Sequence, residues 1–173
     1  MCGIVGYIGN KEALPIILNG LKRLEYRGYD SSGVATYNGS TIVSCKTKGK
    51  ITKLEKSIAK RKNLKGKLGI GHTRWATHGV PNDINAHPQF SNSNNLCLVH
   101  NGIIENYSSV KESLIKKGYE FHSDTDTEVL VNLIEFVKEK KNVKLGEAVQ
   151  IALQQVVGAY AIAVIDNNKP DEI

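Results

Sequence analysis

A cysteine at the second position is the residue of this sequence with the clearest potential for chemistry. Initiator methionine is usually removed before small residues, so we expect Cys2 to become the N-terminus. Its α-amine would then be partly neutral at pH 7, because such amines have a pKa of about 7.7–8.0. The amine could serve as general base for the thiol of the same residue, as in hydrolases with an N-terminal threonine. The alternative is a second residue without any role, and Cys2 alone does not decide between them.

The run GHTRWATHG, residues 71–79, gathers polar and aromatic side chains in one short segment. The guanidinium of Arg74 can bind a substrate carboxylate through two hydrogen bonds, and Trp75 could shield a site from water. Two alternatives are a structural loop and a zinc site. The zinc site would use the four histidines His72, His78, His87 and His100. Their spacing matches no common zinc motif and no cysteine is near them, so we expect no metal and no other cofactor.

Two further motifs offer groups for an amide substrate. In HNG, residues 100–102, Asn101 supplies a side-chain amide and Gly102 an accessible backbone N–H, which are the two parts of an oxyanion hole. Because Asn-Gly is a very common turn, we also expect the Asn101-Gly102 pair to form a turn after the strand that ends at His100. In SDTDTE, residues 123–128, Asp126 lies in the first turn of an expected helix and could hold an ammonium group, with helix capping as the alternative.

These groups together make up a thiol, an amine base, oxyanion donors, a carboxylate clamp and an ammonium clamp. An enzyme that attacks the side-chain amide of a free amino acid needs this set.

Hydrophobic periodicity and turn residues predict the elements that must position these groups. We expect strands over residues 2–8, 33–37, 41–45, 68–72, 96–100, 120–122 and 160–166. We expect helices around residues 14–24, 51–59, 107–117, 125–140 and 145–156. Strands and helices come in pairs, which favours layered α and β over a strict βαβ alternation. The polar segment of residues 73–95 has no clear period, and a loop of that length in a compact domain is more often functional.

Composition describes a single globular domain. The chain has 173 residues, 40% hydrophobic and 23% charged, with no apolar run of the roughly 18 residues that a membrane span needs. The first residues lack the basic region and cleavage site of a signal peptide, so we expect a cytoplasmic protein. The net charge of +6 comes from dispersed lysines without interleaved aromatic residues, which indicates a solvated surface rather than a nucleic-acid site.

The cysteines exclude a disulfide framework, because there are three of them and no CxxC pair. Cys45 and Cys97 lie in apolar, strand-like runs, and we expect them to be buried small hydrophobic residues.

The motifs MCGIVGYIG, LEYRGYDSSG, GHTRWATHG, NAHP, HNGIIEN and SDTDTE, in this order, resemble the N-terminal glutaminase domain of the glucosamine-6-phosphate synthase family, a class II glutamine amidotransferase. The resemblance runs from Met1 to about Asp166. LEYRGYDS and HTRWATHG distinguish it from the related amidophosphoribosyltransferases, asparagine synthetases and glutamate synthases. It implies an α+β fold, the four-layer αββα sandwich of the N-terminal-nucleophile hydrolases.

The resemblance also implies roles for individual residues. Cys2 is expected to be the nucleophile, and Asn101 with Gly102 the oxyanion hole. For the substrate, the implied residues are Arg74 for the α-carboxylate with Thr77 and His78 nearby, Asp126 for the α-amine, Trp75 as a gate that keeps ammonia from water, and Arg27 as a support for the N-terminal strand.

The implied reaction is hydrolysis of L-glutamine to glutamate and ammonia through a Cys2 γ-glutamyl thioester, the ammonia-supplying half of glucosamine 6-phosphate synthesis from fructose 6-phosphate. In the family, further strands and two sugar isomerase domains follow, so residues 1–173 are expected to be a truncated amidotransferase domain. An inactive fragment with an assembly or regulatory role is the alternative. Homo-oligomers are conceivable, whereas nucleic acid and membrane partners are not expected.

Overall fold

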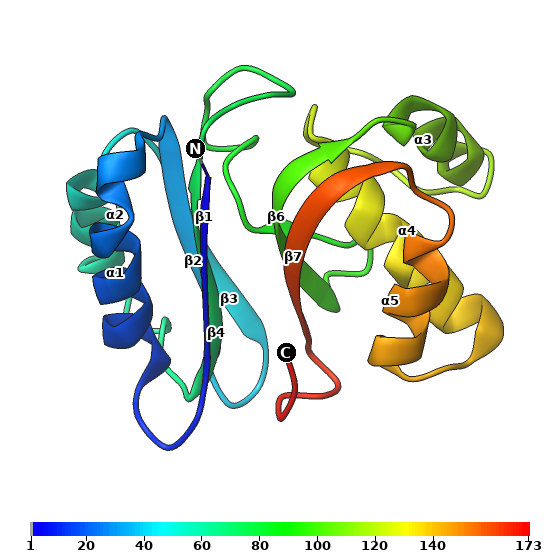
Figure 1. Ribbon diagram of the computed structural model, residues 1–173. Coiled ribbons are helices and arrows are strands. Elements are labelled where there is room, and N and C mark those ends of the chain that lie inside the picture. Colours follow the sequence, from blue (N-terminus) through cyan, green and yellow to red (C-terminus); the bar gives the residue numbers. More distant parts are fainter. Residues whose placement is uncertain (1) are drawn as a thin grey trace.

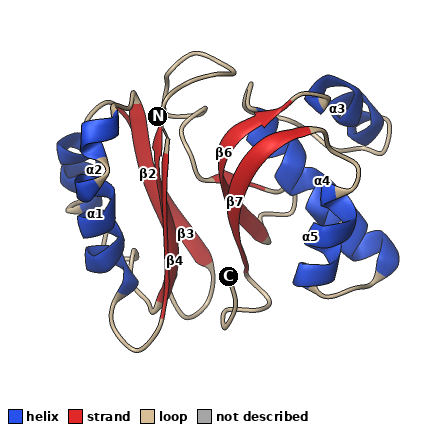
Figure 2. Cartoon of the chain, viewed as in Figure 1, coloured by secondary structure: helices blue, strands red, loops and turns tan. Residues whose placement is uncertain are grey.

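A computed structural model describes residues 2–173. Met1, and with it the expected removal of that residue, lies outside the described part. The chain forms four layers, in which two facing β-sheets are covered on their outer sides by helices (Figure 1, Figure 2). The four-layer αββα prediction is therefore confirmed.

The first half of the chain builds one sheet and its helical cover. The sheet has four antiparallel strands in the order β1-β4-β2-β3. Their bounds are β1 Gly3–Ile8, β2 Ser31–Tyr37, β3 Ile42–Lys48 and β4 Leu68–Arg74. The covering helices are α1 Ala13–Arg23 and α2 Ile51–Ile58, with a short 3₁₀ turn, η1, at Glu25–Arg27. Apolar side chains three and four residues apart on α1 pack against the sheet, as the periodicity predicts.

The second half builds the other sheet and the other helical layer. This sheet has three antiparallel strands in the order β5-β6-β7. The elements are β5 Gln89–Phe90, β6 Leu96–Ile104, α3 Tyr107–Ile115, α4 Asp126–Lys141, α5 Leu145–Leu153 and β7 Gly158–Asp166. Thr125 caps α4, since its Oγ1 accepts a hydrogen bond from the backbone N–H of Glu128 at 3.2 Å, so this predicted helix start is confirmed.

Two details of the expected secondary structure are wrong. Residues 120–122 form no strand, because side chains rather than a neighbouring strand hold their backbone: the N–H of Glu120 donates to Asn92 Oδ1 and that of His122 to Glu128 Oε1. Asn101–Gly102 is not a turn either. β6 continues through this pair to Ile104 and stays in register with β7, where Asn101 faces Ala161.

The apolar cores follow the layers. One lies between α1, α2 and the first sheet, and another between the second sheet and α3, α4 and α5. The third fills the space between the two sheets, which we call the intersheet layer, and consists of Ala35, Ile42, Leu68, Ile70, Cys97, Val99 and Ile165. Cys45 and Cys97 are both buried, as expected.

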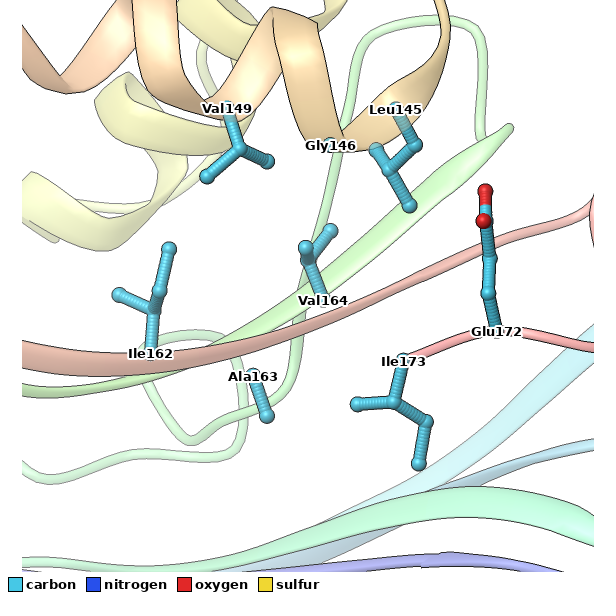
Figure 3. A pocket seen from close by; sticks show the side chains of 8 residues that line it. All are labelled: Leu145, Gly146, Val149, Ile162, Ala163, Val164, Glu172 and Ile173. Atoms are coloured by element: carbon cyan, nitrogen blue, oxygen red, sulfur yellow. The ribbon is translucent and has the colours of Figure 1, made fainter.

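β7 forms an edge of its sheet, with β6 as its neighbouring strand. An apolar groove of about 280 Å³ lies beside it, between β7 and α5 (Figure 3). Leu145 and Val149 of α5 line one side and Ile162 and Val164 of β7 the other, with Ile173 nearby. No helix in residues 2–173 is long and apolar enough to cross a membrane.

Candidate active site

The expected site residues converge at one end of the intersheet layer, where β4 and β6 end and β1 begins. A pocket of about 480 Å³ opens there, lined by Cys2, Arg27, Trp75, Thr77, Asn101, Gly102 and Ile103. A smaller cavity shares part of this wall and continues inward to Arg74, His87, His100, Asp126 and Thr127. Segments far apart in the sequence thus meet around one thiol.

The sulfur of Cys2 is held by the backbone of Trp75. The Trp75 N–H donates to Cys2 Sγ at 3.2 Å, and the Trp75 carbonyl oxygen lies 3.6 Å from the same sulfur. Burial raises the pKa of the Cys45 and Cys97 thiols, whereas Cys2 is only half-buried and lines the pocket. Cys2 is therefore the one of the three cysteines that is placed to react.

Asp30 fastens the loop that carries Trp75. Its carboxylate accepts a hydrogen bond from the Ala76 N–H at 2.5 Å, and its own backbone N–H donates to the Arg74 carbonyl at 2.7 Å. The end of β4 and the first residues of the loop are therefore fixed against the end of η1 and the start of β2. The sulfur-binding N–H of Trp75 lies between these two anchors.

Asn101 is oriented by a buried histidine of the opposite sheet. Oδ1 of Asn101 lies 2.8 Å from Nε2 of His72, which has no exposed surface. Burial lowers the pKa of His72 to about 3, although the hydrogen bond to Asn101 acts in the opposite direction. The imidazole is therefore neutral at physiological pH.

Gly102 cannot be replaced without disturbing the backbone. Its φ is +113°, a conformation that side chains rarely adopt, and a Cβ at this position would lie 2.1 Å from the carbonyl oxygen of Ala159 in β7. The residue is exposed and lines the pocket next to Asn101. Asn101 and Gly102 thus lie side by side in the pocket wall, and their role as an oxyanion hole stays a prediction.

Arg74 is almost fully buried, at 3% exposure. One amino group donates to the carbonyl of His78 and lies 3.5 Å from that of Gly79, while Nη1 has no hydrogen-bond partner among the described residues. Burial lowers the pKa of Arg74, and the carboxylate of Asp30 acts against this shift. A guanidinium with an unused N–H group in the wall of a cavity is suited to receive a carboxylate.

Asp126 is the first residue of α4 and is also buried, at 4% exposure. Oδ2 accepts a hydrogen bond from the Ile104 N–H at 2.9 Å. His100 Nδ1 lies 3.8 Å from Oδ1, and His78 Nδ1 lies 3.9 Å from Oδ2. The carboxylate thus lines the same cavity as Arg74, where it can accept a hydrogen bond from an ammonium group.

The remaining expected residues form the rim. Trp75 is 55% exposed, and Gly28 approaches its ring, since a Cβ there would lie 3.5 Å away. Thr77 is exposed and Arg27, in η1, is half-buried, and both line the pocket with Cys2. His78 is half-buried between Asp126 and the ring of Tyr107, whose centroid is 4.9 Å away. All expected site residues are therefore brought together, whereas their roles stay predictions.

Sequence reasoning missed the polar residues beneath the pocket. Thr127 Oγ1 lies 2.6 Å from His87 Nε2 and 3.0 Å from His100 Nδ1, and burial lowers the pKa of both rings. The ring of His72 packs on that of His87, 4.4 Å away. These histidines were considered only as zinc ligands, and in the described residues they bind side chains of the protein instead. Strand alternation could have predicted this, because side chains two residues apart on a strand point to the same face. His72 lies two residues after Ile70 and therefore shares its inward face.

Comparisons with known proteins agree with this geometry. Residues 44–172 match the model of a family described as glutamine amidotransferase domain. Two curated relatives are both glutamine–fructose-6-phosphate aminotransferases (isomerizing). The protein from Bacteroides thetaiotaomicron is 58% identical to this chain, and the protein from Thermococcus kodakarensis is 53% identical to it. Each match covers all of this chain but only 28% of the relative. The solved glutamine phosphoribosylpyrophosphate amidotransferase of B. subtilis superposes with a TM-score of 0.79 at 31% identity, over 96% of this chain and 35% of that one.

Proposed function

This chain belongs to the glutamine amidotransferase domain family, and from that premise we propose that it hydrolyses the side-chain amide of L-glutamine with Cys2 as nucleophile. One observation carries the proposal. The thiol of Cys2 shares a pocket of about 480 Å³ with the amide of Asn101 and with Gly102, which are separated from it by about a hundred residues of sequence.

In the first half-reaction, the neutral α-amine of Cys2 takes the thiol proton. The sulfur attacks the side-chain carbonyl carbon of glutamine and forms a C–S bond, while the π electrons move to oxygen. The Asn101 side-chain N–H and the Gly102 backbone N–H stabilise that oxyanion. When the carbonyl re-forms, the C–N bond breaks, the nitrogen takes the proton from the α-ammonium, and ammonia leaves a γ-glutamyl thioester on Cys2.

In the second half-reaction, the α-amine takes a proton from water and the resulting hydroxide attacks the thioester. The same two N–H groups stabilise the second oxyanion. Collapse breaks the C–S bond, returns the proton to sulfur and releases glutamate. No redox step or cofactor is needed for this sequence of bonds.

The free amino-acid end of glutamine would lie at the inner wall of the pocket, where the cavity of about 10 Å³ beside Arg74 and Asp126 would widen to admit it. Arg74, with its unused Nη1, would bind the α-carboxylate beside Thr77 and His78, and Asp126 would bind the α-ammonium. Both side chains are buried, which strengthens a charge-assisted hydrogen bond to the substrate. The exposed indole of Trp75 would cover the pocket and keep ammonia from water, and Arg27 would support the N-terminal strand beside it.

We further propose that this chain is the ammonia-supplying part of a longer cytoplasmic protein that aminates fructose 6-phosphate. The names of the relatives and their greater length support this step, since the chain spans 28% of each. The acceptor site would then lie in isomerase domains outside residues 1–173. No observation supports the inactive-fragment alternative, and the pocket holds the Cys2 thiol together with Asn101 and Gly102.

The proposal is tested by incubating the chain with L-glutamine and measuring glutamate and ammonia, after mass analysis has verified that the protein begins at Cys2. An electrophilic glutamine analogue should label the N-terminal peptide and leave Cys45 and Cys97 unmodified. Added fructose 6-phosphate should not change the rate, and no glucosamine 6-phosphate should form. Absence of ammonia release, or labelling of a buried cysteine, would reject the proposal.

The edge of β7 gives a separate expectation about partners. A long edge strand beside an apolar groove invites pairing with another strand. We expect concentration-dependent self-association in light scattering, reduced by Ile162→Lys, which places a charge in the groove. A monomer at all concentrations would contradict this expectation.

A further inference from the structure

The hydrogen bond between His72 and Asn101 joins the two halves of the sandwich. His72 lies within β4, paired with Ile4 of β1 on one side and Gly33 of β2 on the other, while Asn101 belongs to β6 of the opposite sheet. Cys2 immediately precedes β1 in the first sheet. A single 2.8 Å contact thus connects the sheet that carries the thiol to the sheet that carries the side-chain amide.

The tautomer of His72 decides which end of the Asn101 amide faces the pocket. A neutral imidazole carries one proton. The His100 backbone is a competing acceptor that raises the pKa of the ring, but Nδ1 of His72 makes no hydrogen bond of good geometry among the described residues, whereas Nε2 lies 2.8 Å from Asn101 Oδ1. Buried N–H donors without an acceptor are rarer than acceptors without a donor. The proton therefore belongs on Nε2, which donates to Oδ1 of Asn101 and leaves the amide N–H groups to the pocket that Asn101 lines with Cys2.

The ring of His72 is itself held in place. It is fully buried and packs on the ring of His87, 4.4 Å away at an angle of 30°. His87 comes this close because Gly33 has no side chain, since a Cβ there would lie 2.2 Å from the His87 carbonyl oxygen. The imidazole therefore cannot rotate away without moving the 85–88 segment, and the direction of its N–H is fixed.

We infer that His72 is a positioning residue, which holds the Asn101 amide with its N–H groups turned towards the thiol and so aligns the oxyanion hole of one sheet with the nucleophile of the other. The inference rests on the proposed function, in which Asn101 stabilises the oxyanion. Without the bond, the amide can turn about its terminal torsion, which has no strong preference, and present oxygen instead of N–H to a developing negative charge.

Three substitutions separate positioning from simple burial. His72→Gln places an amide N–H where Nε2 stood and should keep kcat within about threefold of the wild type. His72→Leu fills the space without a donor and should lower kcat by about tenfold to a hundredfold, with KM for glutamine within about threefold, because the loss cannot exceed that of the donor itself. His72→Asn is too short to reach Oδ1 and should behave like His72→Leu. Thermal unfolding shows whether each variant is folded at the assay temperature.

A double-mutant cycle tests whether His72 acts through Asn101. In an Asn101→Ala background, His72→Leu should lower kcat by less than about twofold, since there is no amide left to orient. Equal losses in both backgrounds, or full activity of His72→Leu in the wild-type background, would overturn the inference. So would a His72→Gln variant that is folded and as impaired as His72→Leu.

Nuclear magnetic resonance gives a readout that does not depend on activity. The ring ¹⁵N signals of His72 should identify the Nε2–H tautomer and should not titrate above pH 4. The Nδ1–H tautomer, with the His100 backbone as its acceptor, would turn the Asn101 amide round and overturn the inference. If the wild-type protein released no ammonia but the Nε2–H tautomer were found, the proposed function would fail while the orientation of the amide would stand.

Discussion

The two ends of the intersheet layer are built from the same strands but differ in the polarity of their side chains. Along β4, Leu68 and Ile70 pack between the sheets, and His72 and Arg74 follow them on the same face. Along β6, Cys97 and Val99 are succeeded by Asn101 in the same way. At one end the layer is apolar, whereas at the other it is polar and borders the pocket around Cys2.

This difference shows how a site can be held rigidly. Apolar packing at one end keeps the strands in register, and the same strands fix the positions of the side chains at the polar end. Some of the buried polar groups at this end are paired with one another, as in His72–Asn101 and Thr127–His87. Others, among them Arg74 Nη1 and His100 Nε2, have no hydrogen-bond partner among the described residues. Substitutions at the polar end should therefore change catalysis, and substitutions at the apolar end should change stability.

The largest expected effect comes from blocking the α-amine of Cys2. A stable N-terminal tag turns that amine into an amide, which cannot accept a proton, so glutaminase activity should be abolished. Stability should not change, because Cys2 lies outside the packed end of the layer. Activity and thermal unfolding are measured before and after a protease removes the tag to leave Cys2 first. Full turnover by the tagged protein would show that another base takes the thiol proton.

The second effect is the loss of an oxyanion donor. Asn101→Ala should lower kcat by about 10²–10³ with little change in KM, because the donor matters mainly when charge develops on oxygen. Val99→Ala, two residues earlier on the same face, should instead lower stability and leave kcat unchanged. A tenfold or smaller loss of kcat in Asn101→Ala would reject the oxyanion role. A similar kcat loss in Val99→Ala would contradict the expectation that only substitutions at the polar end change catalysis.

The third effect concerns substrate binding at Arg74. Arg74→Lys keeps the charge but loses the planar fork, so KM for glutamine should rise by about tenfold to a hundredfold, the equivalent of a charge-assisted hydrogen bond. Arg61→Lys is a matched control, because the exposed Arg61 only donates to the Ser44 carbonyl at 2.8 Å, far from the pocket. Equal hydrolysis of glutamine and its α-methyl ester, which lacks the carboxylate charge, would show that Arg74 has another role.

The smallest effect is on stability in acid. The pKa of His72 is about 3 in the folded protein and about 6.5 in an unfolded chain, so the unfolded state binds the proton more readily. The contribution of His72 to the free energy of unfolding is therefore fully present above about pH 6.5. It falls as the pH drops towards 3, by at most about 1.4 kcal/mol per pH unit for this one group. Urea unfolding at pH 7, 6 and 5 measures the slope. His72→Gln should reduce the slope, and an unchanged slope would mean that His72 is not the cause.

Periodicity and capping residues in the sequence predicted most of the helices and strands, including the helix capped by Thr125. The four layers and the set of candidate pocket residues followed from the family resemblance of the motifs, and the roles of these residues stay predictions. The Asn101–Gly102 pair was misjudged as a turn because only the pairing with β7 keeps it extended. The contact between His72 and Asn101 could not be predicted either, because it depends on how two sheets meet, and no single-strand pattern carries that information.

The distance in sequence between Cys2 and the other residues of the pocket also has a consequence for synthesis. Cys2 leaves the ribosome before them, and Asp126 follows 124 residues later, which at about 5–20 residues per second is roughly ten seconds. During that interval no pocket surrounds the thiol, so the removal of the residue before Cys2 that the proposed function requires would meet no folded sandwich.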